Sequence, residues 1–173
     1  MPPARDLRRI AVIGAGTAGR DLALRSVRAG FQVTLEDVMP SRLRSAQQSF
    51  ATDPASRLLR LAATVEDAVR DADLAIDFVP DELESKLEIF SMLDRMAPPH
   101  TILCTPTRAL SIADLASCTY RPQLCFGVRF EGTDAELVRT HRSSPDALSA
   151  TGRWLTAMNF SVSIAVDASN LSI

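Results

Sequence analysis

Short apolar runs alternate along the chain with segments in which apolar residues recur at helical spacing. The apolar runs predict strands at 9–13, 31–35, 73–79, 101–104, 124–130, 136–141 and 161–166. The segments between them predict helices at 17–29, 65–70, 81–96, 111–117 and 145–157, with one or two short helices within 41–60. Because strands and helices alternate, the pattern indicates an α/β fold with a doubly wound, mainly parallel sheet, in a single domain over 1–173.

A glycine-rich loop follows the first predicted strand and opens the first predicted helix. It reads Gly14-Ala15-Gly16-Thr17-Ala18-Gly19, which is a G-x-G-x-x-G pattern in the context that the pattern requires. Gly14 allows the tight turn, Gly16 lets the backbone approach a pyrophosphate, and Gly19 lets helix and strand pack closely. With the free N–H groups at the start of the helix, including those of Thr17 and Ala18, the loop predicts a Rossmann-type dinucleotide site.

An acidic residue at the end of the second predicted strand indicates which dinucleotide is bound. Asp37 lies 23 residues after Gly14, where a carboxylate accepts hydrogen bonds from a ribose hydroxyl and repels a 2′-phosphate. This favours NAD over NADP. Glu36 is the competing candidate, since successive strand residues face opposite ways. Arg42 and Arg44 keep NADP open as an alternative.

Composition narrows the classes of partner. The 173 residues are 46% apolar and 23% charged, with a formal net charge of −2, so neither nucleic acid nor a membrane surface is expected. No apolar run is long enough to span a bilayer, and the N-terminus lacks the apolar stretch of a signal peptide. The three cysteines, Cys104, Cys118 and Cys125, show no metal-ligand spacing. Cys104 and Cys125 fall inside apolar runs, which favours buried thiols at these two positions. We expect a cytoplasmic protein without a metal site.

Several segments in order resemble the NAD-binding domain of the 3-hydroxyacyl-CoA dehydrogenases. They are IAVIGAGTAGRDLAL, VTLEDV, DADLAIDFVPDELESKLEIFSMLDRMAPPHTIL, LSIADLA and RPQLCFGVRF, and the likeness covers about residues 8–167. The resemblance implies NAD-dependent oxidoreductase chemistry in fatty acid metabolism. It also implies cofactor contacts from Asp81 and Lys86, with Val79, Pro80 and Thr105 beside them.

The catalytic positions of that family carry different residues here. Where the family has an asparagine and a serine after the fourth strand, this chain has Pro106 and Arg108. The catalytic histidine is replaced by Arg129. The glutamate that orients the histidine falls on Arg139 if the preceding loop is two residues shorter, or on His141 without a gap.

Arginine at the histidine position changes the chemistry that can be expected. Histidine serves as a base because its pKa lies near neutral, whereas arginine stays protonated. In one interpretation Arg108 and Arg129 converge beside the nicotinamide and bind a carboxylate or polarise a carbonyl, with Glu131, His141 or water as the proton source. In a second, the domain is a non-catalytic NAD-binding or protein-interaction module. A third is non-redox chemistry with NAD retained. As an alternative to a role in the site, any single arginine can simply face solvent or pair with a nearby acid such as Glu131 or Asp134.

Two further parts of the family have no counterpart in this sequence. The stretch 41–63 is too short for the family's helical hairpin, which holds the CoA portion. The helical second domain would begin near Asp167, and the sequence ends at Ile173. We therefore expect an uncovered face and predict self-association or a protein partner there. Asp77, within a buried predicted strand, is interpreted as a satisfied structural carboxylate.

Overall fold

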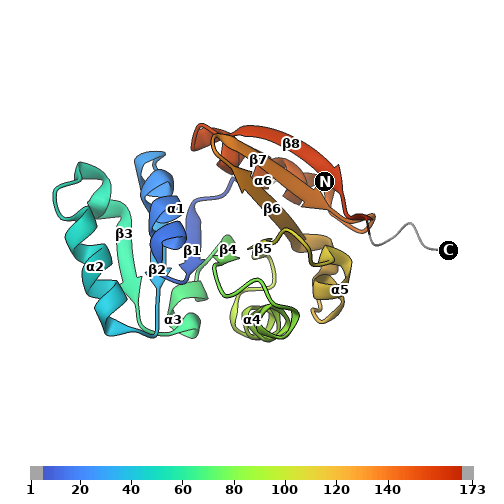
Figure 1. Cartoon of the computed structure of the whole chain (residues 1–173), viewed down its shortest axis with the longest axis horizontal. Coiled ribbons are helices and arrows are strands. Elements are labelled where there is room, and N and C mark those ends of the chain that lie inside the picture. The colour runs from blue at the N-terminus through green and yellow to red at the C-terminus, as the bar shows by residue number, and fades with distance from the viewer. Residues whose placement is uncertain (1–5, 169–173) are drawn as a thin grey trace.

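Strands of one twisted sheet run through the centre of the molecule in the computed structural model, which describes residues 6–168 (Figure 1). The strands are β1 (Arg9–Ile13), β2 (Gln32–Glu36), β3 (Leu59–Ala62), β4 (Leu74–Asp77), β5 (Ile102–Pro106), β6 (Cys125–Glu131), β7 (Asp134–Arg139) and β8 (Ser161–Val166). Their order is β3-β2-β1-β4-β5-β6-β7-β8, and pairing is parallel from β3 to β6. β7 pairs antiparallel with β6 and parallel with β8. The predicted doubly wound, mainly parallel sheet is confirmed.

Helices cover both faces of this sheet. They are α1 (Thr17–Arg28), α2 (Pro40–Phe50), α3 (Val65–Val69), α4 (Leu83–Met96), α5 (Ile112–Ser117) and α6 (Pro145–Ala157), with 3₁₀ turns η1 (Pro54–Leu58) and η2 (Pro122–Leu124). Residues of α1, α2 and α6 form the core on one face, and residues of α3, α4 and α5 form it on the other. On β1, Ile10 and Val12 enter the first core while Ala11 and Ile13 enter the second. A strand buried on both sides is apolar throughout, which explains the short apolar runs in the sequence.

Most predicted elements lie within a few residues of their observed bounds, and α6 and β8 match them. The prediction is wrong at the end of the helical stretch 41–60, because residues 59 and 60 belong to strand β3 (Leu59–Ala62). α2 ends at Phe50 and Pro54 opens the 3₁₀ turn η1, and the four residues after that turn pair in parallel with β2 at the edge of the sheet. Four residues are too few for periodicity to distinguish a strand from a helical turn.

A buried arginine fixes the chain between α4 and β5. The Arg121 guanidinium donates to the Asp94 carboxylate at 2.8 Å and to the carbonyl oxygens of Asp94, Ala97, Pro98 and Thr101. Two of these, the carbonyls of Asp94 and Ala97, are among those that a helix leaves unbonded at its C-terminus. Arg121 therefore ends α4 and holds the start of β5, whose other end reaches the site described below.

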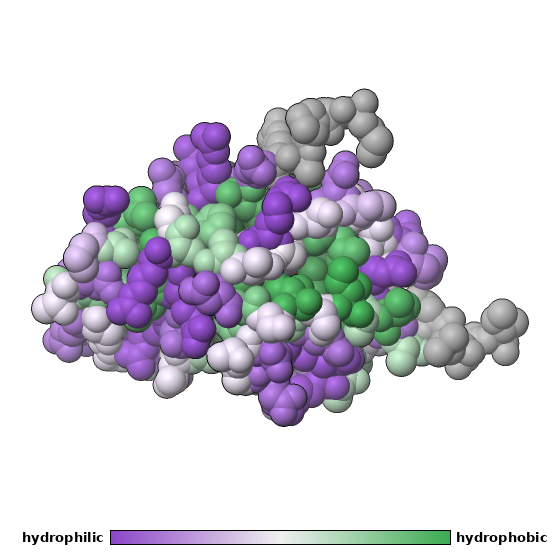
Figure 2. Space-filling model, turned by 90° about the horizontal axis from the view of Figure 1, so that it is seen from above, coloured by the Kyte–Doolittle hydropathy of each residue, from purple (hydrophilic) through white to green (hydrophobic). Residues whose placement is uncertain are grey.

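The free edge of the sheet at β8 exposes apolar side chains. Ile164 and Val166 are largely exposed, and Figure 2 shows apolar side chains gathered at the surface on the side of the molecule that carries β8. The predicted self-association or partner binding at an uncovered face stays a prediction. Within residues 6–168, no helix combines the length and hydrophobicity needed to cross a bilayer.

Candidate functional site

The glycine loop lies at the carboxyl end of β1, between β2 and β4, where the direction of the chain connections reverses. In open α/β sheets this switch point is where ligands bind. Gly14 has φ +104°, which other residues rarely adopt. A Cβ on Gly19 would lie 1.8 Å from the Gly14 carbonyl oxygen, so only glycine fits there. A Cβ on Gly16 would meet no atom within 4 Å, so Gly16 leaves open space rather than packing against the protein.

The start of α1 faces that open space. Gly16 is the N-cap residue, no side chain caps the helix, and its first turn holds no acidic residue. Thr17 and Ala18 are exposed. Uncapped N–H groups and the positive end of the helix dipole attract an anion. The loop therefore fits the pyrophosphate of a dinucleotide, as the sequence predicted.

Asp37 follows β2 and connects it to the glycine loop. Its carboxylate accepts hydrogen bonds from the backbone N–H of Ala15 at 2.9 Å and of Met39 at 2.8 Å. Arg42 forms an ion pair with it at 3.4 Å. The structure thus places Asp37 beside the loop, where a ribose hydroxyl would reach it. Glu36, the alternative candidate, is also buried in this region.

A hollow of about 370 Å³, here called the Asp37 hollow, opens beside these residues. Its polar lining residues include Glu36, Asp37, Arg42 and Glu88. Its walls are apolar and include Val65, Phe78, Val79, Pro80, Ile89 and Met92. Val79 and Pro80, which the resemblance placed at the cofactor, therefore lie in the same hollow as Asp37.

A second hollow of about 310 Å³, here called the arginine pocket, lies at the carboxyl ends of β4, β5 and β6. Ala18, Asp81, Lys86, Arg108 and Arg129 all line it. The Asp81 carboxylate accepts the backbone N–H of Arg108 at 3.1 Å, which joins the loop after β4 to the loop after β5. The structure thus brings both predicted arginines together with the start of α1.

Arg129 has a partner that the sequence did not indicate. Its Nη1 donates to Glu136 at 2.6 Å, and both side chains are 40% exposed. The two residues are direct neighbours in the antiparallel β6–β7 pair. The acids expected as partners, Glu131 and Asp134, lie at the exposed turn between these strands. Only the register of β6 and β7 reveals Glu136, and sequence spacing alone does not give that register.

Other catalytic candidates fall outside the arginine pocket. Among the described residues that line it there is no Glu131, Arg139 or His141. Arg139 stands at the far end of β7, opposite Val166 of β8, because the hairpin carries it away from Arg129. The hypothesis of Glu131 or His141 as the proton source therefore has no support from their positions.

A buried ion pair lies beneath the pocket. Lys86 Nζ and Asp77 Oδ1 are 2.7 Å apart, and their side chains are 1% and 0% exposed. Burial raises the pKa of Asp77, and the Lys86 ammonium opposes this rise. The expected structural carboxylate thus has Lys86 as its partner, and the ammonium of Lys86 is already bound. Thr105, another predicted cofactor contact, is fully buried and lines neither hollow.

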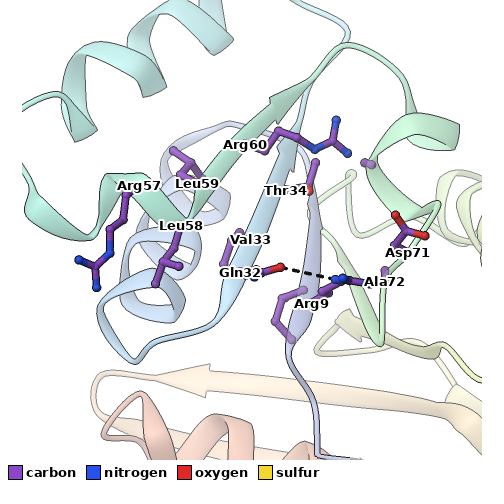
Figure 3. A pocket seen from close by; sticks show the side chains of 12 residues that line it. Arg9, Gln32, Val33, Thr34, Arg57, Leu58, Leu59, Arg60, Asp71 and Ala72 are labelled. Atoms are coloured by element: carbon purple, nitrogen blue, oxygen red, sulfur yellow. Dashed lines mark hydrogen bonds between the residues drawn. The ribbon is translucent and has the colours of Figure 1, made fainter.

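A further hollow of about 390 Å³ lies at the opposite edge of the sheet, at the amino ends of β1, β2 and β3. Arg9, Arg57 and Arg60 line it, but their side chains point in different directions (Figure 3). Arg60 is paired with Asp67 at 2.8 Å, and Arg9 donates to Gln32. This hollow is far from the glycine loop, and its arginines do not converge on one point.

The cysteines play no visible part in the site. Burial raises the pKa of Cys125 to about 12 and that of Cys104 well above its usual value, so neither forms a thiolate near neutral pH. Within residues 6–168, no group of three or more histidine, cysteine or acidic side chains is placed to hold a metal ion.

The family model of the 3-hydroxyacyl-CoA dehydrogenase NAD-binding domain matches residues 9–168. The chain belongs to this family. NAD is accordingly the cofactor of the domain, in agreement with the prediction, and the glycine loop, the start of α1 and Asp37 fit it. The domain is related to oxidoreductases, as expected.

Curated relatives agree with this assignment. The probable 3-hydroxybutyryl-CoA dehydrogenase of Bacillus subtilis is 32% identical over 141 residues, which are 72% of this chain and 49% of that protein. The peroxisomal bifunctional enzyme of Danio rerio is 31% identical over 178 residues, 94% of this chain and 24% of that protein. The chain thus spans half or less of the length of these two relatives.

Solved structures show the same fold. FadB2 of M. tuberculosis is 27% identical with a TM-score of 0.82, and the match covers 95% of this chain and 66% of that one. The (S)-3-hydroxybutyryl-CoA dehydrogenase PaaH1 of Ralstonia eutropha has a TM-score of 0.87 over 94% of this chain and 65% of that one. At 18% identity, this second likeness concerns the fold alone.

Proposed function

We propose that this domain is an NAD-dependent oxidoreductase that acts on an anionic substrate bearing a carboxylate or a thioester. The observation that carries the proposal is the presence of Arg108 and Arg129 in one pocket with Ala18 and Asp81, next to the start of α1. Guanidinium groups bind planar anions through two parallel hydrogen bonds. A substrate held there lies beside the nicotinamide end of a dinucleotide whose pyrophosphate sits on the glycine loop.

The two arginines have different roles in this proposal. Arg108 is exposed, and Asp81 fixes its backbone, so its side chain is available to an incoming anion. Arg129 is held by Glu136, which orients the guanidinium, and its remaining N–H groups can polarise a carbonyl oxygen. Bound NADH would supply the hydride to the carbonyl carbon. Because arginine does not exchange a proton, water at the pocket mouth would supply the proton in place of the family's histidine.

The substrate prediction is tested by replacing Arg108 with alanine. Loss of a charged hydrogen bond costs roughly 1.5–3 kcal/mol, so the KM for an anionic substrate is expected to rise about 10- to 100-fold. The assay follows NADH oxidation against a panel of keto acids and acyl thioesters, and calorimetry measures NAD affinity, which is expected to stay within about twofold. Arg142→Ala, at an exposed position outside both hollows, is the matched control. An unchanged KM in the Arg108 variant would reject the anion site.

A second candidate is an NAD-binding domain without catalytic activity. The observation in its favour is the ion pair between Arg129 and Glu136, which occupies the position of the family's catalytic base. Under this hypothesis, NAD raises the melting temperature of the protein, but no member of the panel oxidises NADH. Turnover that depends on Arg108 would exclude it.

A further inference from the structure

Glu36 is a buried carboxyl that no step above uses. It is the last residue of β2, it pairs in register with Ile13, and it lines the Asp37 hollow. Its side chain is 3% exposed, and its Oε1 has no hydrogen-bond partner. A buried polar atom without a partner is costly, so its position at the wall of a hollow indicates that a ligand atom can satisfy it.

The position of the hollow indicates which part of the cofactor enters it. In this fold the acidic residue after the second strand binds the adenosine ribose. Asp37 holds that place and lines the same hollow as Glu36. The adenine ring attached to this ribose would therefore enter the hollow between apolar residues such as Val65 and Ile89, and Glu36 lines the same hollow.

The protonation state of Glu36 decides whether this contact is favourable. A neutral carboxyl has one O–H donor and one carbonyl acceptor, which complement the ring nitrogen and the amino group of adenine. An ionised carboxylate can only accept hydrogen bonds, so it cannot donate to the ring nitrogen. The adenine ring would also shield the carboxylate from water, which disfavours its charged form. The charged residues that face it are Asp37 on β2, Arg42 on α2 and Glu88 on α4, while β1, α3 and the segment after β4 present apolar residues. Arg42 is already paired with Asp37, so Glu36 has no cation of its own.

We infer that Glu36 is a specificity-determining residue of the cofactor site, whose protonated carboxyl hydrogen-bonds the edge of the adenine ring, so that NAD binding is coupled to proton uptake. The inference rests on the NAD site and is independent of the substrate and of turnover. It applies to any ligand that carries the adenosine half of the cofactor.

The expected pH dependence follows from the state of Glu36 before binding. Burial, followed by the neighbouring Asp37, raises the pKa of Glu36 from 4.5 to about 7. Near pH 6 most molecules already carry the proton, and at pH 8 about one in ten does. If only the protonated form binds well, the Kd for NAD is expected to be about tenfold higher at pH 8 than at pH 6.

Calorimetric titration of NAD into the whole chain tests this coupling. At pH 7.5, in buffers of different ionisation enthalpy, wild type is expected to take up more than half a proton per NAD. ADP-ribose, which lacks nicotinamide, is expected to show the same uptake and the same rise in Kd. If wild type takes up no proton, or if ADP-ribose shows no pH dependence, the inference is wrong.

Variants assign the proton to this residue. Glu36→Gln keeps one donor and one acceptor at every pH, so its Kd at pH 8 is expected to match that of wild type at pH 6, without proton uptake. Glu36→Leu is expected to bind weakly at both pH values. Glu84→Gln, on the exposed start of α4, is the control and is expected to keep the tenfold change. A tenfold change that persists in Glu36→Gln would overturn the inference.

The melting temperature without ligand provides a second measurement. A carboxyl whose pKa is higher in the folded state loses its stabilising contribution as pH rises from 4.5 through 7. Glu36→Gln is therefore expected to melt above wild type at pH 8 and close to it at pH 5. Equal melting temperatures at pH 8 would contradict a charged Glu36 that destabilises the folded state, and with it the proton coupling. Because neither readout involves turnover, failure here is distinct from failure of the proposed function.

Discussion

Gly16→Val is expected to abolish NAD binding while the protein stays folded. A side chain at this position meets no protein atom within 4 Å, and its backbone has φ −67°, which any residue adopts. It would instead fill the space at the start of α1 where the pyrophosphate approaches the backbone. We expect the Kd for NAD to rise at least about 100-fold, because both the close approach and the N–H contacts are lost.

Calorimetry gives the affinity, and thermal unfolding gives the stability. Valine is a poorer N-cap residue than glycine, which costs about 1 kcal/mol and lowers the melting temperature by roughly 2–4 °C. Gly19→Ala is the contrasting variant, since its Cβ would lie 1.8 Å from the Gly14 carbonyl oxygen and would disrupt the packing of loop and helix. If Gly16→Val binds NAD like wild type, the pyrophosphate does not lie on this loop.

The cofactor half of the site was predictable from sequence because its residues are close together along the chain. The apolar run of β1, the glycines after it and the amphipathic α1 form one continuous segment, and each has a local signature. Asp37 follows from the same pattern, because it ends the next strand. The structure adds that Asp37 also holds the loop through the Ala15 N–H.

The contacts of the arginine pocket and parts of the fold were harder to predict because they join distant segments. The Arg129–Glu136 pair depends on the register of a hairpin, and β3 depends on pairing with β2. The five contacts of Arg121 reach residues 20 to 27 positions away. None of these has a periodic or spaced signature in one sequence, since cross-strand and tertiary contacts decide them.

Lys86 shows how a residue identified by resemblance acquires a second role. The sequence placed it at the cofactor, and it does line the arginine pocket. Its ammonium, however, is the partner of Asp77, nine residues earlier in the chain. Since α4 packs against the end of β4 that carries Asp77, the ion pair joins the helix to the sheet directly under the site.

Lys86→Met is therefore expected to destabilise the fold strongly. Removing one partner of a buried ion pair leaves the other charge uncompensated and costs about 3–5 kcal/mol. For a domain of this size this corresponds to a fall in melting temperature of roughly 6–20 °C. The measurement is urea unfolding at pH 6 and pH 8. Without the ammonium, the pKa of Asp77 rises further, so the loss of stability is expected to be larger at pH 8, where the unfolded chain releases the proton more readily.

The double variant Asp77→Asn/Lys86→Met separates the ion pair from the cofactor role. It removes both charges, so most of the stability lost in Lys86→Met is expected to return, to within about 1–2 kcal/mol of wild type. Calorimetry on this restored protein then measures what Lys86 contributes to NAD affinity without interference from unfolding. If Lys86→Met alone keeps its stability and loses only NAD binding, the ammonium serves the cofactor and the buried pair is dispensable. If stability falls in Lys86→Met and recovers in the double variant, Lys86 acts chiefly by holding α4 against Asp77. Asp81, which lies between β4 and α4, then stays in position to bind the backbone of the loop that carries Arg108.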